Sequence, residues 1–343
     1  MKLLKKTMII TLILSLLTSA VCFSASALVI HEGDFGFEVN TTKHEATLVS
    51  YSGTGESVVI PDYFRNYPVT VIDKNAFSGN ETIKEVTFSD TNTTVEEYAF
   101  RGCSALETVY IPENVVSFGD RAFADCTSLK TVTLLSDMVS MPSNMFSGCS
   151  SLENLTINEK IADFGYGCFN GCSSLSDLSF VKNGAMLDSY AFNGTGAESV
   201  VLSDSILAIP NYAFTNCPNL KTVTIPESVV LIQPYAFDWE NVTIRCYQDS
   251  YAHSFAVENN LSYWLLERSI LGDVDKDGDI SINDVTAIQQ YIAELEKPDE
   301  VSLLAADANQ DGEIDIADAT ALQMYLAEYD ISYPIGEYIF VND

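Results

Sequence analysis

The sequence predicts an α+β protein in which a solenoid of short parallel strands is followed by a small helical domain. Two observations support this prediction. A phenylalanine recurs with a 23-residue period through the middle of the chain, and an acidic segment near the C-terminus is repeated at a 34-residue offset. A fixed period of about 20 to 50 residues is typical of repeat architectures, in which each unit buries its apolar face by stacking on its neighbours.

The repeat units share a pattern of apolar positions. In one unit, Leu129, Val132 and Leu134 are expected to point inward, and the alternation from Val132 to Leu134 predicts a short strand. The marker phenylalanines keep the period throughout except that the step to Phe214 is one residue shorter; they are Phe77, Phe100, Phe123, Phe146, Phe169, Phe192, Phe214 and Phe237. The equivalent inward positions in other units are Leu106, Val109 and Ile111; Leu152, Leu155 and Ile157; Leu175, Leu178 and Phe180; and Leu220, Val223 and Ile225.

The ends of the array are expected to differ from its middle, because a solenoid needs terminal caps. Alternation over residues 37–60 predicts a pair of strands that shields the first coil. Residues 241–244 read as the last strand. Residues 250–261 read as an amphipathic helix whose core-facing side chains are Tyr251, Phe255, Ala256 and Leu261.

These repeats resemble a known family. The pattern Ala-Phe-x-x-Cys-x-x-Leu-x-x-Val-x-Ile-Pro is similar to the BspA-type leucine-rich repeats of secreted bacterial proteins, over roughly residues 38–265. The resemblance implies a right-handed leucine-rich-repeat solenoid of about eight 23-residue repeats.

The outward strand positions are polar and form two rows. Such rows could hydrogen-bond a glycan or dock a protein, although β-branched threonine is also what an exposed strand prefers, and no aromatic platform accompanies them. One row is Thr87, Tyr110, Thr133, Thr156, Ser179 and Thr224, and the other is Glu85, Thr108, Thr131, Asn154, Asp177 and Thr222.

The cysteines follow the repeat instead of forming the pattern of a small disulfide scaffold. Of the eight, Cys103, Cys126, Cys149 and Cys172 recur with the same 23-residue period, and Cys217 holds the same place two repeats later. They are most simply small buried apolar side chains. The alternative is bridging between adjacent coils, which brings equivalent Cα atoms within disulfide range.

The N-terminus predicts secretion. Three lysines precede an apolar run from Met8 to Val21, and small residues follow at 25–27, which is typical of a signal peptide cleaved before Leu28. The residues before Cys22 fit a lipoprotein signal poorly, and no other segment is apolar enough to span a membrane. We therefore expect a signal peptide at residues 1–27, a repeat domain at 28–268 and a C-terminal domain at 269–343.

The net charge of −31 argues against nucleic acid or an anionic membrane as a partner, because phosphate binding needs clustered lysine and arginine. Residues 270–330 contain sixteen acidic and two basic residues. Without cations this segment would repel itself.

The repeated acidic segment has the oxygen-donor spacing of a Ca2+ loop. Donors stand at positions 1, 3 and 5, glycine at 6 and a carboxylate at 12, while position 7 offers its backbone carbonyl. A single match could be a solvated acidic turn, but two copies in register favour two bound Ca2+ ions. The candidate ligands are Asp273, Asp275, Asp277, Asp279 and Asp284 in the first loop, and Asp307, Asn309, Asp311, Glu313 and Asp318 in the second.

An apolar helix follows each loop at the same 34-residue offset, with Val285, Ile288, Ile292 and Leu295 in the first copy. The counterparts in the second are Ala319, Leu322, Leu326 and Tyr329, and residues 297–300 join the two units. Residues 271–329 thereby resemble a type I dockerin, an all-α module with two Ca2+ loop-helix units that binds cohesin domains of cellulosome-like scaffolds. We expect a helix only after each loop. The module is therefore not expected to show the opening motion of a Ca2+-sensor helix pair.

The resemblance implies which residues contact the cohesin. The familiar Ser-Thr pair and the basic residues of the family are absent at these positions, so an apolar-centred interface is expected. The contact residues are Ile282, Asn283, Gln289, Gln290 and Glu294 in one copy, and Ile316, Ala317, Gln323, Met324 and Glu328 in the other. Ile270 and residues 333–335 are expected to join the two ends of the module.

No catalytic site is predicted. The three histidines, His31, His44 and His253, have no nucleophile partner in any recognisable motif, and no phosphate-binding loop or facing carboxylate pair is evident. The sequence therefore predicts an extracellular, non-catalytic binding subunit held on a cohesin-bearing scaffold, with repeats that bind polysaccharide or protein. The alternatives are an enzyme component of a cellulosome acting in polysaccharide degradation, and a free adhesin.

Overall fold

The computed structural model describes residues 28–266, 268–294, 300–336 and 338–340. The expected signal peptide at residues 1–27 lies outside this part of the chain. Among the described residues, no helix has both the length and the apolar character needed to cross a bilayer. The contacts divide the chain into two compact units: the first runs to Ala197 and includes Pro210–Asn219 and Pro234–Phe237, and the second comprises Glu198–Ile209, Leu220–Gln233 and Asp238–Asp343.

The first unit begins with the predicted strand cap. Strands β1 (Ile30–Glu32), β2 (Phe35–Asn40) and β3 (Glu45–Tyr51) pair antiparallel, which confirms the expected strand pair. Strand β3 then pairs in parallel with β6 (Tyr67–Ile72), and the short β5 (Tyr63–Phe64) folds back on β6. The change from antiparallel to parallel pairing marks the start of the coils.

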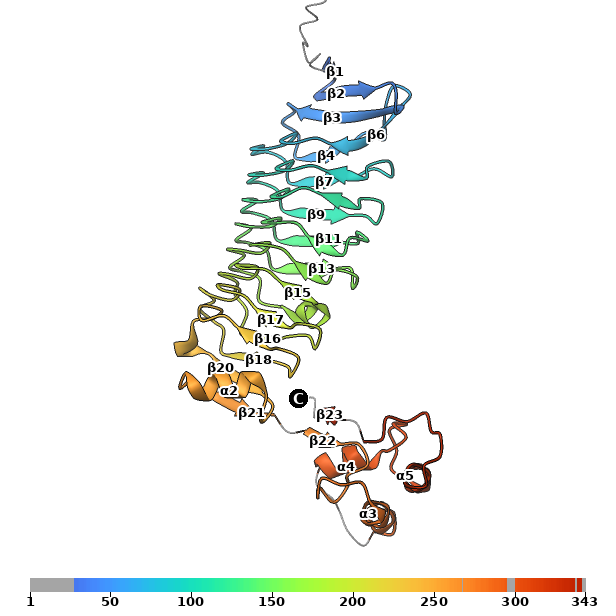
Figure 1. Ribbon diagram of the computed structural model, residues 1–343. Coiled ribbons are helices and arrows are strands. Elements are labelled where there is room, and N and C mark those ends of the chain that lie inside the picture. Colours follow the sequence, from blue (N-terminus) through green and yellow to red (C-terminus); the bar gives the residue numbers. More distant parts are fainter. Residues whose placement is uncertain (1–27, 267, 295–299, 337, 341–343) are drawn as a thin grey trace, which may run out of the picture. The chain divides into compact units, whose positions relative to one another are not determined.

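Parallel strands then stack one per coil, as Figure 1 shows. The register advances by one repeat at each step, so that Thr131 lies between Thr108 and Asn154. The main sheet of the first unit contains β4 (Ser57–Val59), β7 (Glu85–Thr87), β9 (Thr108–Ile111), β11 (Thr131–Leu134) and β13 (Asn154–Ile157). Two-residue strands form the other ladders of this unit: β8 (Thr94–Val95) and β10 (Ser117–Phe118), and β12 (Ser140–Met141), β14 (Asp163–Phe164) and β15 (Met186–Leu187).

The marker phenylalanines form one buried column through the first unit. Consecutive rings, from Phe77 to Phe237, stack with centroids 4.7 to 5.8 Å apart and nearly parallel planes. Each ring is almost completely buried. The fixed period therefore places the same ring above itself in every coil, which is the packing that the sequence predicts.

One coil departs from the prediction. The expected strand at Leu178–Phe180 is replaced by a short 3-10 helix, η1 (Ser179–Asn183). The Asp177 carboxylate accepts a hydrogen bond from the Ser179 N–H (2.8 Å), a local contact that competes with strand pairing. The main sheet consequently ends at β13, where Leu155 and Ile157 are only half-buried rather than core residues.

The second unit contains its own parallel sheet. It consists of β16 (Ser199–Val201), β18 (Thr222–Thr224), β20 (Thr243–Cys246) and β21 (Tyr263–Leu265), beside the pair β17 (Ala208–Ile209) and β19 (Leu231–Ile232) and the 3-10 helix η2 (Trp239–Asn241). The prediction that residues 241–244 form the last strand is wrong, because β21 adds a further strand beyond it.

The predicted helix between these two strands is present as α2 (Tyr251–Glu258). Ser250 caps it by accepting the His253 N–H (3.1 Å). Its buried residues are Ala252 and Ala256, whereas Tyr251 is exposed. The face of the helix that packs on the core therefore differs from the predicted one. Small side chains on this face allow the helix to lie close to β20 and β21.

The described cysteines are buried and unbridged, which agrees with their interpretation as small apolar side chains. All seven described cysteines are buried thiols. The thiol of Cys126 donates a hydrogen bond to the Phe100 carbonyl of the preceding coil (3.2 Å), and Cys103, Cys149 and Cys172 repeat this contact on Phe77, Phe123 and Phe146. The column of thiols satisfies one carbonyl per coil, and the bridging alternative is not realised.

These thiols are predicted to be chemically inert in the folded protein. Burial raises the pKa of Cys168 and Cys172, and raises the pKa of Cys246 to about 11, so little reactive thiolate exists near neutral pH. In a chain that starts at Leu28, Ellman's reagent should detect essentially no thiol without denaturant and all seven in guanidinium chloride. Rapid labelling of the native chain would contradict the burial of the column.

Candidate functional site

The C-terminal part of the second unit carries both acidic loops and three helices, α3 (Ile282–Ile292), α4 (Glu300–Ala306) and α5 (Ile316–Leu326), labelled in Figure 1. Helices α3 and α5 pack against each other over a small core. The buried members of this core are Leu271, Val274, Val285, Ile288, Ala306, Ala308, Ala319, Ala321, Leu322 and Ile335. Val285, Ile288, Ala319 and Leu322 thus confirm the predicted apolar faces, whereas Ile292, Leu326 and Tyr329 are exposed.

The first loop gathers three carboxylates. The candidate ligand atoms of Asp273, Asp275 and Asp277 all lie within 4.8 Å of one another. The Gly278 N–H donates to Asp273 Oδ2 (3.1 Å), which ties position 6 of the loop back to position 1. Gly278 has φ of +91°, a conformation that glycine adopts without a Cβ penalty. The loop backbone therefore turns so that these three side chains converge.

The carboxylate at position 12 holds the loop from the helix side. Asp284 is completely buried; its Oδ1 accepts the N–H groups of Val274 (2.6 Å) and Asp275 (3.1 Å), and its Oδ2 accepts the Ser281 N–H (2.7 Å). Ser281 in turn accepts the Asn283 N–H, which completes a capping box at the start of α3. Asp284 thus fixes the loop to the helix that follows it.

The second loop repeats this arrangement. Asp307 accepts the N–H groups of Asp311 and Gly312 (both 3.0 Å), and Asn309 Oδ1 accepts the Asp311 N–H (2.9 Å). The Asp318 carboxylate is buried and accepts the N–H groups of Asn309 (3.1 Å) and Asp315 (2.9 Å). The sequence repeat of the two loops is therefore also a repeat of hydrogen bonding.

The electrostatics of both loops favour a bound cation. Burial is the main cause that raises the pKa of Asp273, and the carboxylates of Asp284, Asp275 and Asp277 raise it further. The pKa of Asp275 and that of Asp318 are raised for the same reasons. Asp273 Oδ1 is also buried without a hydrogen-bond partner among the described residues. A cation would satisfy this oxygen and offset the repulsion, so the donor set fits Ca2+.

Two candidate ligands contribute no side chain to the cluster. Asp279 and Glu313, at position 7 of each loop, have exposed side chains. Their backbone N–H groups donate to Asp277 Oδ1 and Asp311 Oδ1 (2.9 Å each), so these residues follow the turn and leave the carbonyl as the only ligand they would offer.

The predicted partner-binding residues lie on or beside α3 and α5. Ile282 and Ile316 are the first residues of these helices and are 62% and 63% exposed, which is unusual for isoleucine in a small domain. Gln290 is half-buried, and the remaining predicted contact residues are exposed: Asn283, Gln289, Glu294, Ala317, Gln323, Met324 and Glu328. The two copies thus present matching exposed faces.

Two features of this module differ from the prediction or extend it. Helix α4 precedes the second loop, so the expectation of a single helix per loop is wrong there; the first loop instead follows strand β22 (Arg268–Ile270). Strand β22 pairs antiparallel with β23 (Tyr338–Phe340), and the Gly336 N–H donates to the Leu271 carbonyl (2.9 Å). The two ends are joined as expected, but Ile270 pairs with Tyr338 instead of residues 333–335, of which Ile335 lies in the core. Residues 297–299 of the predicted link between the two loop-helix units lie outside the described residues, as does Leu295.

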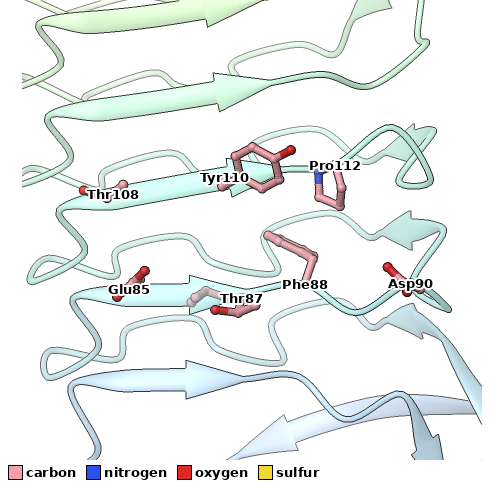
Figure 2. Close-up of a pocket in the computed structure, with 8 residues that line it drawn as sticks. Glu85, Thr87, Phe88, Asp90, Thr108, Tyr110 and Pro112 are labelled. Carbon is pink, nitrogen blue, oxygen red and sulfur yellow. The ribbon is translucent and has the colours of Figure 1, made fainter.

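The repeat region offers a second candidate surface. A hollow of about 410 Å3 lies over β7 and β9, and is drawn in Figure 2. Four of its lining residues, Glu85, Thr87, Thr108 and Tyr110, belong to the two predicted outward rows. Phe88, Asp90 and Pro112 close it at the strand ends. The structure therefore places the two rows side by side on the sheet. In the fifth coil, Asp177 and Ser179 are not part of these rows, because η1 replaces the expected strand.

A row of tyrosines was missed by the sequence prediction. Tyr190 and Tyr212 stack with ring centroids 4.7 Å apart, Tyr212 and Tyr235 with centroids 5.5 Å apart, and Tyr166 packs on Tyr190 at 5.4 Å. The signal was present, because three of these tyrosines stand at the second position before a marker phenylalanine. These tyrosines lie outside the pattern of apolar core positions that defines the repeat.

Comparison with known proteins identifies the class. A profile of the BspA type leucine rich repeat region matches residues 70–195 and 185–266, which is more than half of the chain, and a type I dockerin domain matches residues 271–327. The chain belongs to the BspA-type leucine-rich-repeat family and carries a C-terminal type I dockerin. Both domains are of non-catalytic types, and dockerins bind Ca2+ and cohesin domains.

Solved structures of bacterial leucine-rich-repeat proteins are similar to this chain. A leucine-rich cell surface protein from Faecalibacterium prausnitzii is 22% identical, with 62% of this chain and 74% of that one covered and a TM-score of 0.43. The T. pallidum leucine-rich-repeat protein is 22% identical, with coverage of 59% and 85% and a TM-score of 0.46. A protein from Bacteroides ovatus is 20% identical, with coverage of 63% and 70% and a TM-score of 0.43. Curated protein sequences gave no significant match.

The first loop provides a test of the ligand assignment. Asp273→Asn removes the charge of the buried carboxylate, so the Ca2+ affinity of that loop should fall at least tenfold and calorimetry should detect one strong site instead of two. Asp279→Ala is the matched control, because only its backbone carbonyl is a candidate ligand and its side chain is exposed. Equal affinities for Asp273→Asn and the unmodified protein would show that Asp273 is not a ligand.

The raised pKa values predict how pH affects Ca2+ binding. In the Ca2+-free fold, a raised carboxyl pKa means that stability is gained by proton uptake and is lost as pH rises through that pKa. Ca2+ binds the deprotonated form, so protons compete with it from above the ordinary value of 3.8. The rise in melting temperature on adding Ca2+ should therefore shrink as pH falls from 7 towards 4. A constant rise over this range would exclude these carboxylates as ligands.

Proposed function

We propose that this chain is an extracellular, non-catalytic binding subunit, anchored to a cohesin-bearing scaffold by its Ca2+-dependent dockerin. The observation that carries the proposal is the convergence of Asp273, Asp275 and Asp277 around a buried carboxylate oxygen that has no hydrogen-bond partner among the described residues. The same sequence pattern recurs at residues 307–318. An acidic module of this size is expected to need bound cations to fold firmly.

Two Ca2+ ions would occupy the two loops. Asp273, Asp275, Asp277 and Asp284, with the carbonyl of Asp279, would hold the first ion. Asp307, Asn309, Asp311 and Asp318, with the carbonyl of Glu313, would hold the second. The charge of each ion would offset the repulsion among the loop carboxylates, and the loops would then hold the starts of α3 and α5 in a fixed orientation. Ca2+ in this proposal supports docking and takes part in no reaction.

The docking face is proposed to lie on α3 and α5. The two exposed isoleucines, Ile282 and Ile316, are large apolar side chains that nothing within the described module covers. Of the ten proposed contact residues only Glu294 and Glu328 are charged, which favours an apolar contact with a polar rim over an interface led by charge. The boundary of the dockerin at residue 269, and that of the repeat domain at residues 28–268, belong to the same proposal.

The repeats are proposed to supply the binding function. Their outward strand positions are polar and exposed, and a hollow lined by threonine, tyrosine and carboxylate side chains lies among them. These groups are suited to hydrogen bonding with a polysaccharide or a protein surface. The proposed role is therefore to bring one of these ligands to the scaffold.

Loss of both Ca2+ loops should abolish docking. The double variant Asp273→Ala and Asp307→Ala should fail to capture cohesin modules from the same genome in a pull-down, and a chelator should have the same effect on the unmodified chain. The double variant Asp279→Ala and Glu313→Ala is the control and should be captured normally. Capture of the first variant at unchanged affinity would refute Ca2+-dependent docking.

The docking face can be tested separately from the metal sites. Ile282→Asp with Ile316→Asp places charge at both proposed contacts and should weaken cohesin binding at least tenfold, while Ca2+ binding measured by calorimetry stays unchanged. Unchanged cohesin affinity would place the interface elsewhere on the module.

The alternative function is catalysis on a polysaccharide, which is common for dockerin-bearing chains. Incubation of the full chain with a panel of plant-wall polysaccharides separates the two proposals. We expect no release of reducing sugars from any member of the panel, and measurable turnover would overturn the non-catalytic role.

A further inference from the structure

The feature that the proposed function does not use is the tyrosine row of the first unit, defined as Tyr166, Tyr190, Tyr212 and Tyr235 and called the tyrosine ladder below. Three of its members occupy one structural position, the second before a marker phenylalanine, and Tyr166 stands one place earlier. The end members Tyr166 and Tyr235 are 45% and 61% exposed, and the two between them are half-buried. The ladder therefore lies at the surface.

The backbone at this position explains why the tyrosines are unexpected. Tyr190 and Tyr212 both have φ of +64°, in the left-handed region that a bulky side chain rarely adopts. Four other coils have the same backbone there without a tyrosine: three use residues that tolerate it, Asn75 (φ +61°), Asn144 (φ +56°) and Gly167 (φ +59°), and one uses Arg121 (φ +57°). Most coils thus have a left-handed residue at this point, Tyr235 being the exception, but they do not require tyrosine. An unfavourable residue that recurs where a better one is available suggests a function.

The surroundings of the ladder distinguish it from the tyrosine nearer the N-terminus. Tyr98 has the same backbone conformation, but its ring is approached by Lys74 and Arg101, and its hydroxyl accepts a hydrogen bond from Arg121 (3.2 Å). Lys74 is also paired with Glu97 (2.6 Å). Tyr98 is therefore part of an ionic cluster. The residues directly before and after each ladder tyrosine are all uncharged: Gly165 and Gly167, Ser189 and Ala191, Asn211 and Ala213, and Pro234 and Ala236.

We propose that the tyrosine ladder is the binding surface for a neutral linear polysaccharide. This inference rests on the proposed role of the repeats as a binding region and names the ligand class. Because the rings of Tyr190, Tyr212 and Tyr235 stack face to face, the ladder offers a ligand its ring edges and its hydroxyl groups, and these hydroxyl groups can bond to sugar hydroxyl groups. The ladder repeats this pair of groups every 4.7 to 5.5 Å.

The periodicity selects a polymer over a folded protein as the ligand. A linear polysaccharide presents the same chemistry at each sugar, at a spacing comparable to that of the coils, whereas a folded protein surface does not repeat in this way. The charge selects a neutral polymer over an acidic one. The chain has a net charge of −31, so an anionic polysaccharide would be repelled, and no cation flanks the ladder in sequence to compensate.

The test uses the full chain with Ca2+ and three soluble neutral polysaccharides as probes, namely a β-glucan, a xyloglucan and a galactomannan, in native affinity electrophoresis. The test variant is Tyr190→Asn with Tyr212→Asn, because asparagine occupies the same backbone position in two other coils. We expect at least one polysaccharide to retard the unmodified chain, and the double variant to bind it at least tenfold more weakly. The matched control is Tyr98→Asn, which should be retarded like the unmodified chain.

Stability measurements separate binding from a purely structural stack. The melting temperature of the double variant should be equal to or higher than that of the unmodified chain, since asparagine tolerates a positive φ better than tyrosine does. Tyr235→Ser changes the most exposed member of the ladder and should weaken polysaccharide binding without unfolding the chain. Lack of retardation by all three probes, unchanged binding of both variants, or a lower melting temperature with unchanged binding would each overturn the proposal.

Cohesin capture, measured on the same variants, keeps the two proposals apart. It should be unchanged in the double variant, because the dockerin lies elsewhere in the sequence. An unmodified chain that binds a polysaccharide but is not captured by cohesin would contradict docking alone, and an unmodified chain that is captured but binds none of the three polysaccharides would contradict the ladder alone.

Discussion

The repeat region depends on one constraint: each coil must place its phenylalanine directly on the ring of the previous coil. Rings stacked at 4.7 to 5.8 Å fix the distance between coils, and this distance is close to the spacing of hydrogen-bonded strands. Equivalent residues of neighbouring repeats are therefore separated by this same distance. The thiol of Cys126 meets the Phe100 carbonyl because the coils are one strand apart, and Lys130 reaches Glu107 of the preceding coil for the same reason.

The C-terminal module depends on a different constraint, which is charge. Its core is small and contains several alanines, so apolar burial alone offers limited stabilisation. Its backbone is instead organised by carboxylates: Asp284 and Asp318 each bind backbone N–H groups at both ends of a loop. The buried Asp284 carboxylate lies close to Asp273 and Asp275, and its charge raises their pKa values in addition to the effect of burial. The same acids therefore shape the loop and leave it in need of a cation.

The sequence was sufficient for features that a strict period determines. The coil register, the buried phenylalanine column and the convergence of the first-loop carboxylates all follow from residues at fixed spacing. It was insufficient where a local contact overrides the period. The bond from Ser179 to Asp177 replaces a strand by η1, and no apolar pattern reveals it. Strand β21 and helix α4 were missed for another reason: each is short and has a weak pattern, and each contacts a neighbouring strand, β20 and β22 respectively.

In the tyrosine ladder, the free-energy cost of the left-handed backbone can be compared with the free energy gained by ring stacking. Holding an L-residue in the left-handed region costs roughly 1–2 kcal/mol, whereas asparagine and glycine are tolerated there. An aromatic pair contributes about 0.5–1.5 kcal/mol beyond the area that it buries. The two terms are of similar size, so the stacking of Tyr190 and Tyr212 offsets the strain of their backbone, and Asn75 and Asn144 occupy the same position without an aromatic stack. The fold therefore does not depend on tyrosine at this position, and the surface exposure, uncharged sequence neighbours and regular spacing of the ladder are what a periodic neutral ligand would require.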